Sequence, residues 1–293
     1  MSLKKLKPGT IMEIATTDVI TLPPTTTIMA ATKMMRRYRF RRLPIADPGT
    51  RRLEGIITAT DLVNFFGGGN KYKIIEKRFS GNLIAAINED VREIMEKSVL
   101  SLAYTDDVED GLELMLSRSI GGCPVVDEEN RVVGIVTERD YLRYMAEKYN
   151  LQVKVSDYMT KKVITVTPTV SIADAMRIMI SKKIRRLPII EEGLLMGWLN
   201  TPTIVRYFSG EAFKVLVTGN AEDVLSQPVS TILSSTSSGY MPPLTVLPNE
   251  SMSEVARKML SRRVGCALVV SDGRLEGIIT EQDMIRFLYC EVR

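Results

Sequence analysis

The chain has 293 residues, of which 45% are hydrophobic and 25% charged, a composition typical of a globular protein with a substantial core. It contains no histidine, which excludes Ser-His-Asp and Cys-His catalysis and a histidine-based zinc site. The net charge of +4 only weakly favours polyanionic partners. Three cysteines do not form a disulfide framework, the N-terminus lacks the apolar stretch of a signal peptide, and the apolar runs are strand-sized. We therefore expect a cytoplasmic protein with no membrane span.

Four segments of the chain, each of about 60 residues, repeat the same order of predicted elements. Each begins with an extended stretch, at residues 19–22, 99–102, 163–166 and 244–246. Apolar residues with the spacing 0, 4, 7 then predict helices that begin near Ile28, Val108, Ile172 and Met252. A strand follows, at 43–46, 123–126, 187–190 and 267–270, and a turn leads to a second strand and a second helix. Each unit is therefore predicted to be β-α-β-β-α.

The second strand of each unit ends in the motif Gly-apolar-apolar-Thr-x-x-Asp. Intact copies are Gly55–Asp61, Gly134–Asp140 and Gly277–Asp283. The third unit keeps Gly197 but has Asn200 and Thr203 in place of the threonine and the aspartate.

Equivalent residues also recur at a longer period, because Arg42 and Arg186 are 144 positions apart and Asp140 and Asp283 are 143 apart. A unit of this size cannot bury two helices and a small sheet alone, so the units should pair. We predict an α/β protein of two duplicated modules, 1–150 and 151–293. Their repeats span about 11–69 and 91–147, and about 155–210 and 224–288. The glycine run at residues 67–69 lacks the context of a phosphate-binding loop and is interpreted as a flexible linker.

The Thr-x-x-Asp motif has two interpretations. A threonine followed by a carboxylate three residues later is a common helix N-cap. The same geometry presents backbone donors and a carboxylate that can accept hydrogen bonds from a ribose diol. Unit three helps to decide between them, because Asn200 can still cap the helix while Thr203 leaves the carboxylate without a substitute. The fold tolerates the loss of the aspartate, which favours a ligand role for the intact copies.

Arginines and glycines alternate just before the first hairpin strand. Units one and three carry Arg41-Arg42 and Arg185-Arg186 there, whereas units two and four carry Gly121-Gly122 and Val264-Gly265. If units pair face to face, the arginines of one unit reach the site of the other. Solvated arginines at a helix end are the alternative, and convergence on a helix start would favour phosphate binding.

Together these features resemble the CBS domain, the regulatory repeat of the cystathionine-beta-synthase type, in four copies that form two tandem pairs (Bateman modules). The resemblance covers nearly the whole chain. It implies a stand-alone regulatory protein without catalytic activity, since members of the family bind AMP, ADP, ATP, S-adenosylmethionine or no ligand. It also implies that modules associate head to head through their helices, within one chain or as a homodimer.

The resemblance assigns ligand roles residue by residue. Motif aspartates hold the ribose hydroxyls and motif threonines contact ribose or phosphate: Asp140, Asp283 and Asp61, with Thr137, Thr280 and Thr58. The adenine slot falls to Val99, Ser101, Cys123 and Pro124 in the unit-two site, and to Leu244, Thr245, Cys266 and Ala267 in the unit-four site. The basic residue before Leu-Pro in the partner unit reaches the phosphate, as in the gamma subunit of AMP-activated kinase. That role falls to Arg42 and Arg186, with Arg139 assisting.

Uneven occupancy follows. We expect good adenylate sites in units two and four, a weaker one at Asp61 because it meets Gly121 and Gly122, and an empty one in unit three. The favoured ligand is AMP, with ADP or ATP as further candidates and no metal, and the regulated partner is unknown.

Three alternatives remain. S-adenosylmethionine could replace the nucleotide. Nucleic acid could bind the basic cluster that runs from Arg36 to Arg52 with Tyr38 and Phe40 interleaved. The chain could also be an adaptor with vestigial sites.

Overall fold

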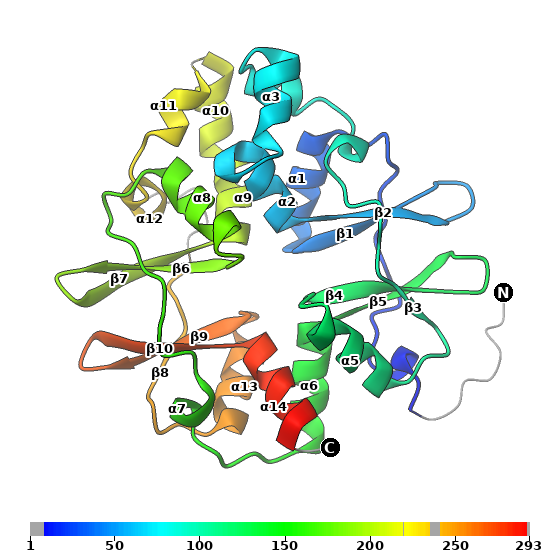
Figure 1. Ribbon diagram of the computed structural model, residues 1–293, viewed down its shortest axis with the longest axis vertical. Coiled ribbons are helices and arrows are strands. Elements are labelled where there is room, and N and C mark those ends of the chain that lie inside the picture. Colours follow the sequence, from blue (N-terminus) through cyan, green and yellow to red (C-terminus); the bar gives the residue numbers. More distant parts are fainter. Residues whose placement is uncertain (1–8, 219, 235–240, 292–293) are drawn as a thin grey trace.

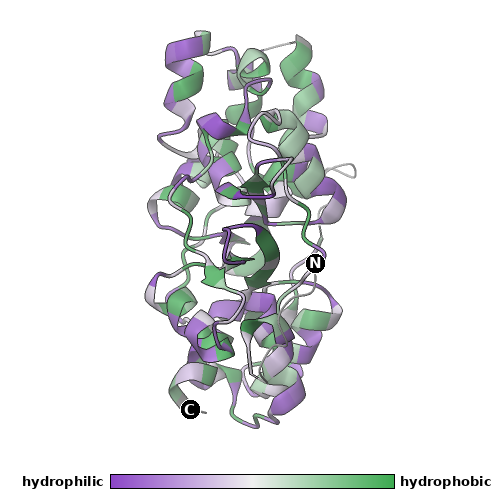
Figure 2. Ribbon diagram, turned by 90° about the vertical axis from the view of Figure 1, so that its right-hand side faces the viewer, coloured by the Kyte–Doolittle hydropathy of each residue, from purple (hydrophilic) through white to green (hydrophobic). Residues whose placement is uncertain are grey.

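The structure is a computed structural model that describes residues 9–218, 220–234 and 241–291. Four similar units surround a common centre, as the view down the shortest axis of the molecule shows (Figure 1). Units one and two lie on the right of that view, and units three and four on the left. In the view turned by 90°, hydrophobic strands lie near the middle of the molecule and helices of mixed character lie at its two ends (Figure 2).

The first helix of every unit forms where the apolar spacing predicts it. Polar side chains start these helices: Thr27 accepts from the amide of Ala30, and Ser251 forms a capping box with Glu254. The four helices are α1 (Ile28–Tyr38), α5 (Val108–Ser117), α8 (Ile172–Ser181) and α13 (Met252–Ser261).

Each unit then forms an antiparallel hairpin whose second strand leads into the second helix. The hairpins are β1 (Arg42–Ala46) with β2 (Leu53–Thr58), β4 (Gly122–Val126) with β5 (Val132–Thr137), β6 (Arg186–Glu191) with β7 (Leu194–Asn200), and β9 (Cys266–Ser271) with β10 (Arg274–Thr280). The second helices are α2 (Ala59–Val63), α6 (Glu138–Lys148), α9 (Thr201–Phe208) and α14 (Glu281–Glu291). The predicted β-α-β-β-α order is confirmed.

In units one to three, the segment at the start of the unit contacts two sheets. Its far end joins its own hairpin in parallel, as β3 (Leu102–Ala103) and β8 (Thr245–Val246) in units two and four. In units one and three the same contact is a single bridge, at Leu22 and Val166. The residues just before the extended stretch instead bridge the motif strand of the neighbouring unit. Thr16 bridges Ile135, Glu96 bridges Ile56, and Thr160 bridges Ile278. Paired units therefore exchange the segments that precede their sheets.

The two halves of the chain associate through helices, as the family resemblance implies. One hydrophobic core combines side chains of units one and three, and another combines those of units two and four. Phe66 and Phe208, for example, stack across the first of these interfaces with ring centroids 4.5 Å apart. In the second interface α6 packs against α13 and α14. The disc in Figure 1 is thus assembled within a single chain.

The interpretation of the glycine run as a flexible linker is wrong. Residues Asn64–Gly68 continue α2 as a π-helical turn, η2, and pack against α8. Gly67 and Gly68 are buried, and a Cβ at Gly68 would lie 2.9 Å from the side chain of Ile180. Glycine is needed here because two helices approach closely, which is a packing requirement rather than a flexibility requirement.

Short helices complete the fold. Between units one and two lie α3 (Tyr72–Phe79) and α4 (Leu83–Ala86), and between units three and four lie α10 (Glu211–Thr218), α11 (Ala221–Leu225) and α12 (Ser230–Ser234). The remaining elements are α7 (Val155–Tyr158) and the 3-10 turns η1 (Ile11–Glu13) and η3 (Val91–Glu93). Within the described residues, none of the helices is both long enough and apolar enough to cross a bilayer.

Candidate functional site

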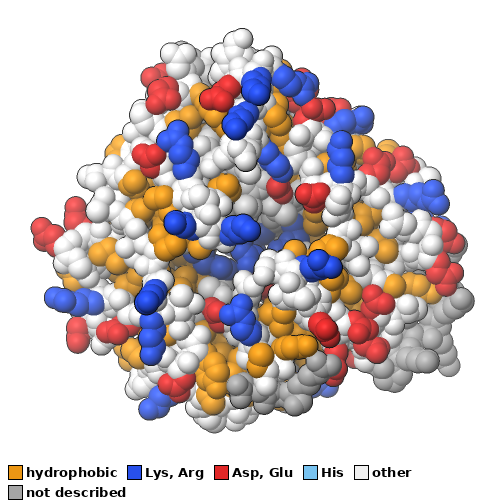
Figure 3. Space-filling model, viewed as in Figure 1, with side chains coloured by type: hydrophobic (Ala, Val, Ile, Leu, Met, Phe, Trp, Pro, Cys, Tyr) orange, Lys and Arg blue, Asp and Glu red, His pale blue; other side chains and the backbone are white. Residues whose placement is uncertain are grey.

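A cavity of about 980 Å³ opens at the centre of the disc. On the face shown in Figure 3, lysine and arginine side chains gather around this hollow and line it. The cavity is bounded by the Thr-x-x-Asp motifs of units one and four, with Thr58 and Asp61 on one side and Thr280 and Asp283 on the other. Two repeats from opposite halves of the chain therefore share one opening, which we call the front cavity.

The motif aspartates cap their helices with only one carboxylate oxygen. In Asp61, Asp140 and Asp283, Oδ2 accepts from the amide and the hydroxyl of the motif threonine at 2.6–2.9 Å. In unit three, Asn200 Oδ1 accepts from the amide of Thr203 at 3.0 Å, so the helix is capped without a carboxylate. The capping interpretation is confirmed, and it leaves Oδ1 of each aspartate available for a second partner.

The second oxygen has a different environment in each intact motif. Asp61 Oδ1 accepts from Lys71 Nζ at 2.5 Å, and that lysine also donates to the carbonyl of Ile94. Asp140 Oδ1 lies 3.6 Å from Arg143, and burial raises the pKa of Asp140. For Asp283 Oδ1, the described part of the chain provides no hydrogen bond or ion pair. Asp283 is thus the motif aspartate best placed to accept a ligand.

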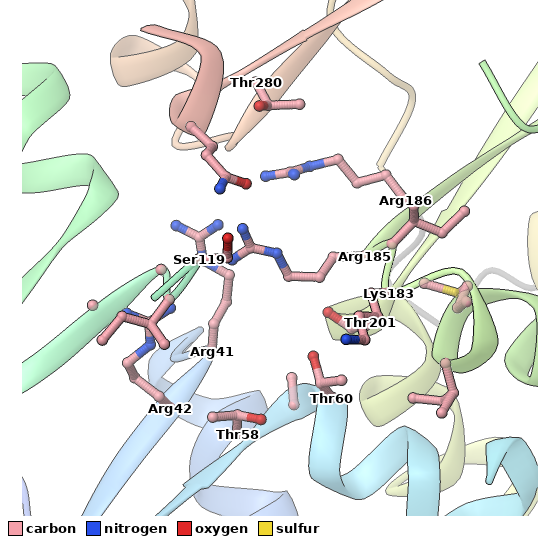
Figure 4. Close-up of a pocket in the computed structure, with 18 of the residues that line it drawn as sticks. Arg41, Arg42, Thr58, Thr60, Ser119, Lys183, Arg185, Arg186, Thr201 and Thr280 are labelled. Atoms are coloured by element: carbon pink, nitrogen blue, oxygen red, sulfur yellow. The ribbon is translucent and has the colours of Figure 1, made fainter. Parts of the chain in front are cut away.

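Four arginines converge between the two motifs (Figure 4). The guanidinium groups of Arg41 and Arg185 lie close together at the centre, with Arg42 and Arg186 entering from either side. All four come from the start of a first hairpin strand or the residue before it, in units one and three.

Two buried glutamates hold part of this cluster, and they do so across the halves of the chain. Arg41 donates to Glu281 Oε2 at 2.7 Å, and Arg185 makes a double contact with Glu138 at 2.8 and 3.2 Å. Arg139 contacts Glu281 as well, at 3.2 Å. Five arginines therefore face two glutamates at the centre, and the site carries an excess of positive charge.

The pKa values of the central groups reflect this crowding. Burial alone would raise the pKa of Glu138, but Arg185, with Arg41 and Arg186, outweighs it and lowers that pKa to about 2. Burial together with the neighbouring Arg41 lowers the pKa of Arg42 to about 10. Arg42 Nη1 is also buried without a hydrogen-bond partner among the described residues. An anion in the front cavity would satisfy this guanidinium.

The alternating glycines make room for the arginines. A Cβ at Gly121 would lie 2.6 Å from guanidinium nitrogens of both Arg42 and Arg185, and one at Gly265 would lie 2.5 Å from Arg186. Arg186 instead donates to the carbonyl of Gly265 at 2.6 Å. Units that supply arginines thus pair with units that supply space for them.

The structure groups the expected lining residues differently from the sequence analysis. Val99 lies with Asp61 rather than with Asp140, because Glu96, three residues earlier, bridges Ile56 in the motif strand of unit one. Residues 160–164 accompany Asp283 for the same reason. Seven further expected residues line neither this cavity nor the second pocket described below: Ser101, Cys123, Pro124, Leu244, Thr245, Cys266 and Ala267. Cys123, Pro124, Cys266 and Ala267 are buried within their own sheets.

The arginines and the unit-two motif also differ from expectation. Arg42 lines the cavity that contains Asp61, the aspartate of its own unit, instead of serving Asp140. Gly121 and Gly122 accommodate Arg42, so they do not deprive the Asp61 site of a cation. Arg186 lines the cavity with Asp283 as expected. Thr137 and Asp140 line neither pocket, and Arg139 lies in the second pocket.

Sequence reasoning gave no role to Glu138, Glu281 or Lys71. The two glutamates follow the motif threonine in units two and four, where units one and three have Ala59 and Thr201. This alternation matches that of the arginines and glycines, and it was a usable signal. Lys71 lies in the segment between units, where no repeat identifies it.

Comparison with known proteins agrees with this architecture. The model of the CBS domain matches residues 11–68, 91–147, 155–210 and 223–289. The chain belongs to the CBS domain family. An uncharacterised protein of Methanocaldococcus jannaschii, MJ1225, is 34% identical over 94% of this chain and 98% of its own length. A 33.4 kDa uncharacterised protein from the ribosomal RNA operon of Thermofilum pendens is 31% identical over 90% of this chain and 86% of its own length.

The crystal structure of MJ1225 extends the similarity of this CBS protein to the whole fold. It superposes with a TM-score of 0.88, covering 95% of this chain and 99% of the other, and it is described as a candidate archaeal homologue of the γ subunit of AMPK. An uncharacterised conserved protein from Pyrococcus horikoshii, 19% identical, has the same fold with a TM-score of 0.58.

Proposed function

We propose that this CBS protein is a non-catalytic regulatory protein that binds adenine nucleotides, with AMP favoured, in the front cavity. Asp283 and Asp61 would hold the ribose hydroxyls of two ligands, and the arginines between them would hold the phosphates. Both aspartates are positioned by caps that use Oδ2 and present Oδ1. The cavity volume lies at the upper end of the range of about 300–1,000 Å³ that is usual for small-molecule sites.

The observation that carries this proposal is the pairing of Asp283, with its uncommitted Oδ1, and an arginine cluster that lacks enough carboxylates. A diol acceptor and phosphate donors within one cavity fit a nucleoside monophosphate. S-adenosylmethionine fits less well, because its sulfonium would meet the excess positive charge.

The basic cluster expected to bind nucleic acid does not form one surface. Arg42 lies at the centre of the disc, whereas Arg52 lies in the hairpin turn and donates to the carbonyl of Glu129 at 3.1 Å. Arg36 and Arg39 line a different pocket. The structure therefore gives the nucleotide the stronger support.

Ligand binding would be transmitted through the ion pairs between the halves. A phosphate that engages Arg41 and Arg185 competes with Glu281 and Glu138 for the same guanidinium groups. Because these pairs join opposite halves of the chain, the ligand changes how the halves are held together and can alter a surface read by a partner protein.

Calorimetric titration of AMP, ADP, ATP and S-adenosylmethionine, after removal of co-purified ligand, tests the proposal. Asp283→Thr and Asp61→Thr reproduce the residue found in unit three, so they remove the carboxylate while the helix stays capped. Asp174→Ala is the control, because Asp174 belongs to the cap of α8 and does not line the cavity. We expect two nucleotides per chain, the tighter at Asp283, and the loss of one in each threonine variant. Unchanged binding in both threonine variants would refute the proposal.

A further inference from the structure

A second pocket, of about 590 Å³, lies where the C-terminal ends of α1 and α13 meet the start of α9. It shares Arg41, Arg185, Arg186 and Thr201 with the front cavity, and its other lining residues are its own. It occupies the position where unit three has lost the motif aspartate, since Asn200 is among its lining residues. The proposed nucleotide function leaves this pocket without a role.

The lining of this pocket carries charge of one sign. Ten arginines and not one aspartate or glutamate line it, counting residues 9–218, 220–234 and 241–291. Five of these arginines form ion pairs with Glu138, Glu281 or Asp140, which do not line the pocket: Arg41, Arg139, Arg143, Arg185 and Arg186. The other five have no ion pair within the described structure: Arg36, Arg39, Arg206, Arg262 and Arg263.

Arg206 shows how this excess arises. It follows Thr203 by three residues, just as Arg143 follows Asp140 and pairs with it at 3.6 Å. In unit three the aspartate is absent, and within the described residues Arg206 Nη2 donates to the hydroxyl of Thr203 at 3.1 Å and to no carboxylate. Its Nε is buried and has no hydrogen-bond partner in the part of the chain that the structure describes. Burial, with Arg39 and Arg36 nearby, lowers the pKa of Arg206.

Guanidinium groups without ion pairs that line one pocket favour a multivalent anion, because each fork can donate two hydrogen bonds to oxygens of one phosphate. A single phosphate carries at most about two charges at neutral pH, fewer than the five unpaired cations here. Among the described lining residues no carboxylate is present to accept from a ribose diol, and Asn200 Oδ1 already accepts from both the amide and the hydroxyl of Thr203.

We propose that this pocket binds an anion with two or more linked phosphate groups and that binding requires no ribose. The anion is either an inorganic polyphosphate or the phosphate tail of a nucleoside polyphosphate. Tyr38 and Phe40 are exposed and stacked 5.5 Å apart, and both line the pocket, so a base could contact them in the second case. The proposal does not rest on nucleotide binding in the front cavity, although Arg41, Arg185 and Arg186 line both pockets.

The test is calorimetric titration of inorganic tripolyphosphate into the full chain after removal of bound ligand. We expect one tripolyphosphate per chain in this pocket. Arg206→Gln should raise the dissociation constant of tripolyphosphate about tenfold or more, since hydrogen bonds to charged groups are lost. Arg36→Gln, on the exposed wall, should act in the same direction. Arg257→Gln is the matched control, because Arg257 is an exposed arginine on α13 that does not line the pocket. Binding that is the same in native protein, Arg206→Gln and Arg36→Gln would overturn the proposal.

Two further experiments distinguish the second pocket from the front cavity, and inorganic polyphosphate from a nucleoside polyphosphate. Asp283→Thr should abolish AMP binding at its site and leave tripolyphosphate binding unchanged, so each proposal can fail alone. In the Asp61→Thr/Asp283→Thr background, equal binding of ATP and tripolyphosphate indicates phosphate recognition alone, and tighter binding of ATP that Tyr38→Ala removes indicates a nucleotide. A single-stranded oligonucleotide that binds while tripolyphosphate does not would overturn the proposal in favour of a polymer.

Discussion

Arg41 of unit one and Glu281 of unit four form a 2.7 Å ion pair that joins the two halves of the chain. Arg185 and Glu138, the equivalent residues in the repeat, form its counterpart at 2.8 Å. The same arginines line the front cavity. Residues proposed to bind phosphate therefore also hold the halves of the disc together, which couples ligand binding to assembly.

Glu281→Gln should destabilise the ligand-free protein. The substitution leaves Arg41 and Arg139 close together without a counter-charge, and breaking a buried pair in this way typically costs about 3–5 kcal/mol. Urea denaturation measures the loss, and AMP should restore part of it by supplying a phosphate. Glu129→Gln is the control: its pair with Arg131 is exposed, and its loss should cost less than about 1 kcal/mol. Equal losses in the two variants would contradict a structural role for the central pair.

Glu138 should make stability depend on pH in the acid range. Its pKa is about 2 in the folded protein against 4.5 in the unfolded chain, so the unfolded state binds more protons between these values. The contribution of Glu138 is fully present above about pH 4.5 and is lost as the pH falls through about 2. The free energy of unfolding of Glu138→Gln should therefore fall less steeply with acid than that of the native protein. Parallel curves would show that Glu138 does not titrate as described.

Lys71→Ala should strengthen nucleotide binding at Asp61. In the ligand-free structure Lys71 Nζ occupies Asp61 Oδ1, so a ribose has to displace it. Removing the lysine frees the acceptor, and the second, weaker binding step should tighten by about threefold to tenfold, a gain of about 1 kcal/mol. Lys73→Ala is the control, since Lys73 is exposed on α3, two residues after Lys71, and has no contact with Asp61 in the described structure. Weaker binding in Lys71→Ala would show instead that the lysine contacts the ligand.

Arg42→Met should separate stability from binding. Arg42 carries a buried charge with an unpaired Nη1, so an apolar side chain of similar length should raise the unfolding free energy without ligand by about 1 kcal/mol. The same change removes a phosphate donor and should weaken AMP binding about tenfold or more. Thermal unfolding with and without AMP shows both effects. A variant that is less stable without ligand would mean that Arg42 is satisfied by the protein.

The repeat made most of the fold predictable. The spacing of apolar residues in Ile28–Tyr38 and its equivalents fixes the helices, and the motif fixes where each second strand ends. The survival of a capped helix at Asn200 without an aspartate also follows from local chemistry. These features depend on residues close together in the chain.

The grouping of the site residues was not predictable in the same way. Which extended stretch meets which aspartate depends on the exchange of segments between units, for example Glu96 pairing with Ile56. The pairing of Arg41 with Glu281 depends on how the two halves close. The glycine run at residues 67–69 was misinterpreted because its requirement comes from α8, a helix more than one hundred residues away in the sequence.

The most direct test of the central claim is a crystal structure of the protein with AMP. We predict AMP in the front cavity, with its ribose hydroxyls within hydrogen-bond distance of Asp283 Oδ1 and its phosphate on the central arginines, Arg41, Arg42, Arg185 and Arg186. AMP bound at Asp140, or absent from the front cavity at saturating concentration, would contradict it.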